Sequence, residues 1–389
     1  MERRSFLGGL AAAATIPLAS SIRGFSEPAS GTVPVPAQIK AFSIDFNWET
    51  GVQKFAAPGL WADADPEKHI RWYEDLGANA VQTFAVSCNG YAWYKHGFVP
   101  SQPGLKHDFL TDMASLGHKR GMQVMGYFCI GANSKWGIDH PGLSYGAPAQ
   151  CHIPLTDAYL NYLCRSIEDV MEKTGMDGFM IDWVWNPGIP FPEEVRKAGW
   201  LPAEQRLFEQ LTGKPFPTSG RPEDAEKLEY ERKAIDRCWA RIKETRDRVN
   251  PHCIIWLSCY DFMNPTVKGS KILQEVDWSM NENPDPKLYR TGKQMAGPHV
   301  RMIQNLVGWP THDAAKFLAD PVNRSLDLYG FASPGPNSLL APIEEYLSKP
   351  AACFTGTDLA SVNRRNITAL AQFYRGLPSV GDKIAAHCA

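Results

Sequence analysis

Apolar runs of strand length alternate with segments of helical periodicity along most of this 389-residue chain. The runs are almost continuously apolar, which is typical of parallel strands buried on both faces. They comprise residues 41–48, 80–86, 123–130, 179–185, 253–258, 276–280, 300–307 and 326–332. Eight such runs, separated by helical segments, predict a (β/α)8 TIM barrel. A doubly wound sheet is the alternative, but no GxGxxG sequence follows the first strand.

The helical segments carry recognisable ends. Asp65 followed by Pro66 has the chemistry of a helix start, and Gly77 is placed to end that helix. Further helices are predicted over residues 105–119, 158–173, 222–249 and 361–374. Residues 261–274 leave room for a short helix at best, so the fifth and sixth repeats are the least regular.

A long insertion follows the fourth strand. Residues 186–221 are rich in proline, glycine and aromatic side chains, and they exceed the usual βα loop of about 2–6 residues. We expect this segment to form part of a binding cleft at the top of the barrel. The predicted organisation is a leader in residues 1–30, the barrel in 31–350 and a C-terminal helical extension in 351–389.

The amino terminus predicts export. Arg3 and Arg4, followed by Ser-Phe-Leu, resemble the twin-arginine signature, and residues 8–18 form a short apolar region before small residues. This region is shorter than the roughly 20 residues of a membrane-spanning helix. We therefore expect a protein exported folded, periplasmic or secreted, without stable membrane insertion once the signal is removed.

Charge and cysteine content exclude several classes. The net charge is −2, with 21% charged residues and no block of like charge, which argues against a nucleic-acid partner. The nine cysteines form no CxxC pair, and a chain of this size does not need disulfides. Because Cys151 and His152 alone do not make a metal site, we predict no structural metal and no cofactor. No feature of the sequence specifies an oligomeric state.

Polar chemistry gathers where the predicted strands end, which is where TIM barrels place their active sites. Four carboxylates fall there: Asp45, Asp182, Asp261 and Glu282. Glycoside cleavage needs two carboxyl groups, one as nucleophile or base and one as acid. Because strands four and six can face each other across the barrel mouth, we predict Asp182 and Glu282 as this pair.

Aromatic and amide side chains accompany these acids. Aromatic rings stack on sugars and amides bind hydroxyls, so the combination predicts a carbohydrate site for an oligo- or polysaccharide. The predicted substrate-binding residues are Asp45, Asn47, Trp48, Asn89, Tyr91, Trp93, Tyr127, Trp136, His152, Trp185, Tyr260, Asp261, Asn305 and Trp309.

Each of these residues also has a structural interpretation. Asp182 could cap the turn that follows it, and any single aromatic residue could belong to the core. The two-residue period of a strand places Trp183 and Trp185 on the side opposite Asp182, facing helices. Asp277, lower in strand six, is expected to be structural.

Two runs carry a family resemblance. DPEKHIRWYEDLGANAVQTFAVSCNGYAWY and PGLKHDFLTDMASLGHKRGMQVMGYF resemble the bacterial family called hypothetical glycosyl hydrolase six, a barrel family related to the family 29 α-L-fucosidases. CHIPLTDAYLNYLCRSIEDVMEKTGMDGFMIDW resembles the matching segment of such barrels, in which Asp-Gly precedes a strand bearing the catalytic Asp. The resemblance covers residues 40–185 and, in the second half, only VDWSMNENP.

The resemblance implies a retaining, α-L-fucosidase-like glycosidase, exo-acting or directed at oligosaccharides, with Asp182 as nucleophile and Glu282 as acid/base. The chain departs from the fucosidases after strand two, where Cys88-Asn89-Gly90-Tyr91 replaces their His-His pair, and it lacks their C-terminal β-sandwich. The resemblance therefore does not specify the sugar.

Two other functions stay open. A metal-dependent sugar isomerase or epimerase needs carboxylate and His ligands from several strand ends, whereas strand seven ends in Gln304-Asn305 and strand eight lacks a terminal acid. A non-catalytic carbohydrate-binding barrel would have its acids on different faces. A retaining enzyme predicts carboxyls about 5–6 Å apart, and an inverting one about 6.5–9.5 Å.

Overall fold

The computed structural model describes residues 33–49, 54–146, 152–184, 199–333 and 339–377. The predicted leader in residues 1–30 and Trp185 lie outside these ranges. The described residues all belong to one compact unit, Thr32–Ala389. Among the helices of these ranges, none combines the length and apolar character needed to cross a membrane.

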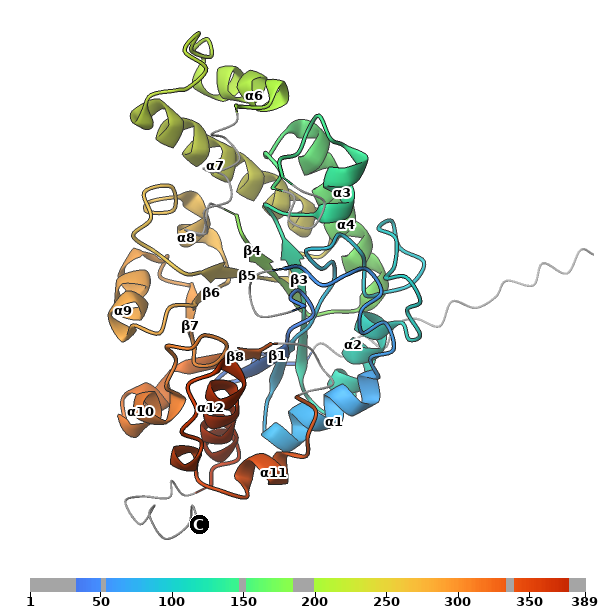
Figure 1. The fold of residues 1–389 in the computed structure, drawn as a ribbon, viewed down its shortest axis with the longest axis vertical. Coiled ribbons are helices and arrows are strands. Elements are labelled where there is room, and N and C mark those ends of the chain that lie inside the picture. Colours follow the sequence, from blue (N-terminus) through green and yellow to red (C-terminus); the bar gives the residue numbers. More distant parts are fainter. Residues whose placement is uncertain (1–32, 50–53, 147–151, 185–198, 334–338, 378–389) are drawn as a thin grey trace, which may run out of the picture. The chain divides into compact units, whose positions relative to one another are not determined.

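Eight parallel strands follow one another in sequence order around a closed barrel (Figure 1). They are β1 (Lys40–Ile44), β2 (Ala80–Gln82), β3 (Gln123–Cys129), β4 (Gly178–Asp182), β5 (Ile254–Cys259), β6 (Trp278–Asn281), β7 (Arg301–Asn305) and β8 (Asp327–Ala332). β1 and β8 close the ring in a register that pairs Ala41 with Tyr329. Each strand overlaps one predicted apolar run, which confirms the (β/α)8 barrel.

Helices surround the barrel, and their ends follow local sequence chemistry. The side chain of Asp65 accepts hydrogen bonds from the backbone amides of Glu67 and Lys68, and Gly77 ends the first helix with φ 84°. The larger helices are α1 (Pro66–Leu76), α2 (Phe109–Lys119), α4 (Asp157–Thr174), α6 (Pro202–Thr212), α7 (Asp224–Val249), α9 (Pro286–Met295) and α12 (Leu359–Tyr374). The shorter ones are α3 (Ser134–Asp139), α8 (Lys271–Glu275), α10 (Ala314–Ala319) and α11 (Ile343–Leu347), with 3-10 turns at Asn323–Ser325 and Ala351–Cys353.

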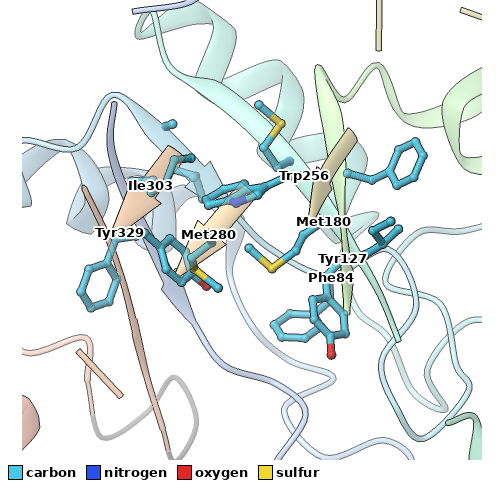
Figure 2. Packing of buried hydrophobic residues seen from close by; sticks show 14 of the residues in the cluster. Phe84, Tyr127, Met180, Trp256, Met280, Ile303 and Tyr329 are labelled. Atoms are coloured by element: carbon cyan, nitrogen blue, oxygen red, sulfur yellow. The ribbon is translucent and has the colours of Figure 1, made fainter. Parts of the chain in front are cut away.

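The barrel interior is filled by large side chains, several of which are labelled in Figure 2. The Trp256 ring lies 5.1 Å from that of Tyr329, and the Phe84 ring lies 5.0 Å from that of Tyr127. Trp256 precedes Ser258 by two residues on β5, so both point to the same side of the strand. Packed side chains therefore close the barrel beneath its carboxyl-terminal opening.

The described part of the insertion after β4 has a core of its own. Trp200, Leu207 and Phe208 of the α6 region pack with Tyr230 of α7. Glu204 is completely buried there and accepts hydrogen bonds from Tyr230 (2.9 Å) and Tyr145 (2.5 Å). Hydroxyl donors thus satisfy this buried carboxyl. Residues 199–221 form a packed subdomain on α7, and none of them lines the main pocket described below.

Acidic residues at the amino ends of β4, β6 and β8 bind basic side chains and backbone amides. Asp177, before β4, accepts from His118 at 2.9 Å and from the amide of Val124 at 2.8 Å. Asp277, before β6, accepts from Arg246 at 2.9 Å and from the amide of Ile255 at 2.8 Å. Such bonds tie each strand to its neighbour, in agreement with the structural role expected for Asp277.

The third member of this set is Asp327, the first residue of β8. Arg301 binds both of its carboxyl oxygens, at 2.5 and 2.7 Å, and the amide of Ile39 donates to it at 2.6 Å. A bidentate guanidinium–carboxylate pair is among the stronger polar contacts in proteins. The closing strands of the barrel are therefore fastened at their amino ends.

Helix α12 covers the seam between β1 and β8 (Figure 1). The hydroxyl of Tyr374 donates to the carbonyl of Ala41 at 3.0 Å, and Lys40 Nζ donates to the carbonyl of Tyr374 at 2.8 Å. The amide of Asn363 donates to the carbonyl of Ser333, just after β8, at 2.8 Å. These contacts join α12 to both closing strands.

Candidate active site

A cavity of about 320 Å³ opens at the carboxyl ends of the strands, which is the size of a small-molecule site. Its lining contains three carboxyl groups among aromatic and apolar side chains. The lining residues are Ser43, Asp45, Asn47, Trp48, Gln82, Phe84, Tyr127, Met180, Asp182, Trp183, Ser258, Tyr260, Met280, Glu282, Trp309, Tyr329 and Phe331.

Asp182 ends β4 and accepts hydrogen bonds from two donors. Tyr127 donates to Oδ2 at 2.8 Å, and the backbone amide of Trp183 donates to Oδ1 at 2.9 Å. Burial raises the pKa of Asp182 to about 6, although these hydrogen bonds act in the opposite direction. At neutral pH, Asp182 is therefore mostly ionised and fixed in orientation.

Glu282 follows β6 and faces the same cavity. Ser258 donates to Glu282 Oε2 at 3.3 Å and lines the same cavity as Asp182. Burial, followed by the charge of Asp182, raises the pKa of Glu282 to about 8. Glu282 is therefore mostly protonated at neutral pH. The lower pKa of Asp182 suits a nucleophile, which must be ionised, and the higher pKa of Glu282 suits a general acid, which must carry a proton.

Asp45 is the third carboxyl and lies just beyond the end of β1. Its Oδ1 accepts from the amide of Asn47 at 2.7 Å, whereas its Oδ2 has no hydrogen-bond partner among the described residues. Burial raises the pKa of Asp45 to about 7, with a further contribution from the charge of Asp182. Asn47 in turn accepts from the amide of Cys88 at 2.9 Å, which connects the β1 and β2 loops.

Trp183 lines this cavity, so the expectation that it faces the surrounding helices is wrong. The strand period ends at Asp182, and Trp183 adopts a positive φ of 55°, which only two other described non-glycine residues do. This conformation costs roughly 1–3 kcal/mol. The Trp183 ring lies 6.1 Å from the ring of Trp48 and 5.7 Å from that of Phe55. An aromatic wall results on this side of the cavity.

A second aromatic group forms the opposite part of the lining. The Trp309 ring meets Tyr260 and Phe331 edge-on, at 6.3 and 5.7 Å. His312 Nδ1 accepts from the backbone amide of Trp309 at 3.2 Å. Burial lowers the pKa of His312 to about 4, so this imidazole is neutral and supports the Trp309 loop.

The structure brings eight of the predicted site residues together in one cavity. Asp182, Glu282, Asp45, Asn47, Trp48, Tyr127, Tyr260 and Trp309 line the main cavity directly. Asn89 and Tyr91 line a neighbouring surface hollow with Lys54 and Lys135. The remaining described predictions lie elsewhere.

Four predicted residues are occupied by other contacts. Trp93 is buried, and its ring stacks on Phe46 at 4.2 Å. Trp136 stacks on His140 at 4.1 Å in a small separate core. Asp261 accepts from the amide of Met263 at 2.8 Å, and Asn305 is fully buried with its oxygen on the amide of Val307. The loops determine where these four side chains lie, and the periodicity of the strands does not predict the course of a loop.

His152 lines a smaller cavity on the far side of Trp183, beside Glu204 and Tyr230. Its backbone pairs with Tyr145 and Ala132 in short bridges. It is therefore separated from the acid pair by the Trp183 backbone and ring.

The sequence interpretation missed several lining residues that share a simple signal. Ser43, Met180 and Met280 precede the acids Asp45, Asp182 and Glu282 by two positions, so the strand period places them one level deeper in the same cavity. Ser258 is the last polar residue of the predicted fifth strand. The other missed residues are Gln82, Phe84, Tyr329 and Phe331.

Within the described ranges, no three His, Cys, Asp or Glu side chains are grouped so that they could hold a metal ion. The ligand convergence that a metal-dependent isomerase requires is thus not found among these residues.

Residues 65–183 match the family described as "Hypothetical glycosyl hydrolase 6", which confirms the resemblance inferred from the sequence. Curated protein sequences give no match. Together with the barrel and its acids, the family match supports a glycoside hydrolase.

Solved structures with the same barrel include α-L-fucosidase isoenzyme 2 from Paenibacillus thiaminolyticus, with a TM-score of 0.57 and 13% identity over 87% of this chain and 49% of the fucosidase. The chain thus spans about half the length of that enzyme. The PgaB (BpsB) glycoside hydrolase domain from Bordetella bronchiseptica gives a TM-score of 0.50 and 10% identity over 75% of this chain and 92% of that domain. At these identities the likeness establishes the fold.

Proposed function

We propose that this protein is a retaining glycoside hydrolase with Asp182 as nucleophile and Glu282 as acid/base. The observation that carries the proposal is that both carboxyls line one cavity and lie close enough for the charge of Asp182 to raise the pKa of Glu282. Retaining enzymes use two carboxyls about 5–5.5 Å apart that face one site. The pKa values of about 6 for Asp182 and about 8 for Glu282 favour the same assignment of roles.

The reaction has two steps. Asp182 attacks the anomeric carbon while the bond to the leaving oxygen breaks and Glu282 gives its proton to that oxygen. Glu282, now ionised, takes a proton from water, and the water oxygen displaces Asp182 from the anomeric carbon. Both carboxyls return to their starting states. The hydrogen bond from Tyr127 orients the nucleophile.

The cavity supports an exo-acting enzyme or one that removes units from oligosaccharides. Met180, Met280 and Tyr329 line it below the acids, and packed side chains such as Trp256 lie deeper. A closed floor and a volume of about 320 Å³ suit the terminal units of a glycan. Trp48, Trp183 and Trp309 offer aromatic faces for the sugar.

The test is a screen of aryl glycosides, followed by trapping with the fluorinated analogue of whichever substrate is cleaved. Fluorine at the position next to the anomeric carbon slows the second step more than the first, so a covalent sugar should accumulate. Mass spectrometry is expected to locate it on Asp182. An inverted product by proton NMR, or a label on another residue, would contradict the retaining mechanism.

We also propose that the protein is exported folded by a twin-arginine signal, in agreement with Arg3, Arg4 and the apolar stretch that follows. Fusing residues 1–30 to a reporter that folds only in the cytoplasm should carry the reporter into the periplasm. Replacing Arg3 and Arg4 together by Lys is expected to stop this transport. Continued transport would contradict the proposal.

A further inference from the structure

One oxygen of the third carboxyl stands out among the polar atoms of the cavity. Asp45 is only 4% exposed, lines the cavity, and leaves Oδ2 without a hydrogen-bond partner among the described residues. Leaving a buried polar atom unsatisfied costs about 1–3 kcal/mol, and more for a charged group. Glu204, which is buried more completely, has two tyrosine hydroxyls on its carboxyl. This fold therefore can supply hydrogen-bond donors to a buried carboxyl, whereas at Asp45 one oxygen has no donor among the described residues.

The turn at the end of β1 does not explain the charge. Oδ1 of Asp45 accepts from the amide of Asn47 at 2.7 Å, a local contact that Asn or Ser makes equally well. A neutral residue would give the same turn without the free-energy penalty of burying a carboxylate beside Asp182. The second carboxyl oxygen of Asp45, which has no partner among the described residues, is thus not needed for the turn.

The charges around the cavity restrict the ligand. Its described lining holds three carboxyls, Asp45, Asp182 and Glu282, and no Lys, Arg or His side chain. A sugar that carries a carboxylate or sulfate would meet like charge there without a compensating cation. A neutral sugar instead offers hydroxyl donors, which are the partners that a carboxylate oxygen accepts.

We propose that Asp45 determines specificity by accepting a hydrogen bond from one hydroxyl of a neutral sugar in this cavity. This inference rests on the proposed hydrolase function. Trp309 also lines the cavity, and its Nε1 is a buried donor without a hydrogen-bond partner among the described residues. A sugar hydroxyl oxygen can accept from that indole. The cavity therefore presents an acceptor and a donor to the hydroxyls of one sugar ring.

The experiment compares the wild-type enzyme with Asp45→Ala on one aryl glycoside and on its monodeoxy analogues. For wild type, one analogue should lose roughly 10- to 100-fold in kcat/KM, the effect of a lost hydrogen bond to a charged group. Asp45→Ala should lose a similar factor on the parent substrate and show no further loss on that analogue. The other analogues should be affected equally in both enzymes.

Two variants serve as controls. Asp261→Ala removes an acid from the same end of the barrel that does not line the cavity, and it should leave all rates unchanged. Asp45→Asn retains the turn contact, so it replaces Asp45→Ala if the alanine variant does not fold. Thermal melting of each variant confirms folding before the kinetics are compared.

The outcomes separate this inference from the proposed function. An Asp45 variant whose loss is the same on the parent and on every analogue, or one with no loss, overturns the role of Asp45 while the hydrolase stands. Faster cleavage of an aryl uronide than of the matching neutral glycoside overturns the neutral-sugar assignment. A wild-type enzyme that cleaves no aryl glycoside refutes the hydrolase, and the Asp45 inference fails with it.

Discussion

The two ends of the barrel use acidic residues in opposite ways, and β4 and β6 show both. At the amino end, Asp177 is paired with His118, and Asp277 with Arg246, and each carboxyl also binds a backbone amide of the adjacent strand. At the carboxyl end, the acids of the same two strands face a cavity whose described lining has no cation. One strand therefore carries a neutralised acid at one end and an uncompensated acid at the other.

The comparison shows that the surroundings of an acidic residue, rather than its type, determine whether its role is structural or catalytic. A paired acid at the amino end fixes the register of neighbouring strands. At the other end, burial without a cation raises the pKa of both Asp182 and Glu282, which makes proton transfer near neutral pH possible. Stability and chemistry are thus separated along the length of single strands.

The strongest test of this difference removes the carboxylate charge, while keeping the size of the side chain, at each end of β4. Asp182→Asn keeps the size of the side chain but removes the attacking charge, so kcat should fall by roughly 10³-fold or more. Its melting temperature should stay equal or rise slightly, because a buried charge is lost. Asp177→Asn should show the reverse, with a lower melting temperature and nearly normal kcat. If Asp182→Asn lowers stability and retains turnover, Asp182 is a structural cap.

Glu282→Gln tests the acid at the carboxyl end of β6. Removing the proton donor should lower kcat roughly 10²- to 10⁴-fold on substrates with a poor leaving group. The loss should be much smaller for a dinitrophenyl glycoside, whose leaving group needs no proton. Equal losses on both substrates would exclude Glu282 as the general acid.

Breaking a pair at the amino end should affect stability alone. Arg246, which is 7% exposed, donates to Asp277 and to the carbonyl of Cys253, both at 2.9 Å. Arg246→Met should lower the free energy of unfolding by about 2–3 kcal/mol, below the full effect for a buried pair because Asp277 is partly exposed.

The matched control for Arg246→Met lies on the same helix. Lys243 pairs with Glu275 at 2.9 Å in a more exposed position, so Lys243→Met should change stability by about 1 kcal/mol or less. Urea unfolding measures both variants, and kcat of each folded enzyme should be unchanged. A tenfold loss of kcat in Arg246→Met would contradict the separation of the two ends.

The pH profile gives the smallest but most direct readout of the raised pKa values. Activity should fall below about pH 6, where Asp182 becomes protonated and cannot attack, and above about pH 8, where Glu282 loses the proton it must donate. Tyr127→Phe removes a hydrogen bond that lowers the pKa of Asp182, so the acidic limb should move to higher pH. An unchanged acidic limb in this variant would exclude Tyr127 as the residue that tunes Asp182.

The sequence predicts the barrel and the positions of its acids for related reasons. Parallel strands buried on both faces read as apolar runs, so all eight strands could be located, and Asp45, Asp182 and Glu282 stand at their ends. Strand order then places these ends around one opening. The barrel topology is therefore sufficient to predict that these three acids lie near one another.

Loop residues could not be predicted in the same way. Trp93 and Trp136 come after strands, as Trp48 does, yet they pack on Phe46 and His140, because the course of each loop decides which ring reaches the core. Trp183 enters the cavity only through its positive φ, which periodicity does not reveal. Tyr127 and Ser258 lie near Asp182 but come from other strands, β3 and β5. Their proximity to Asp182 can be predicted only once the register of the barrel strands is known.

The position of α12 has a consequence for the order of events during synthesis. Strands β1 and β8 lie at opposite ends of the barrel sequence, and the helix that fastens both of them is translated after all eight strands. Until β8 has been synthesised and pairs with β1, the sheet has two unpaired edges that other chains can join. Closure of the ring therefore waits for the last strand, and α12 adds its contacts to the seam only after that.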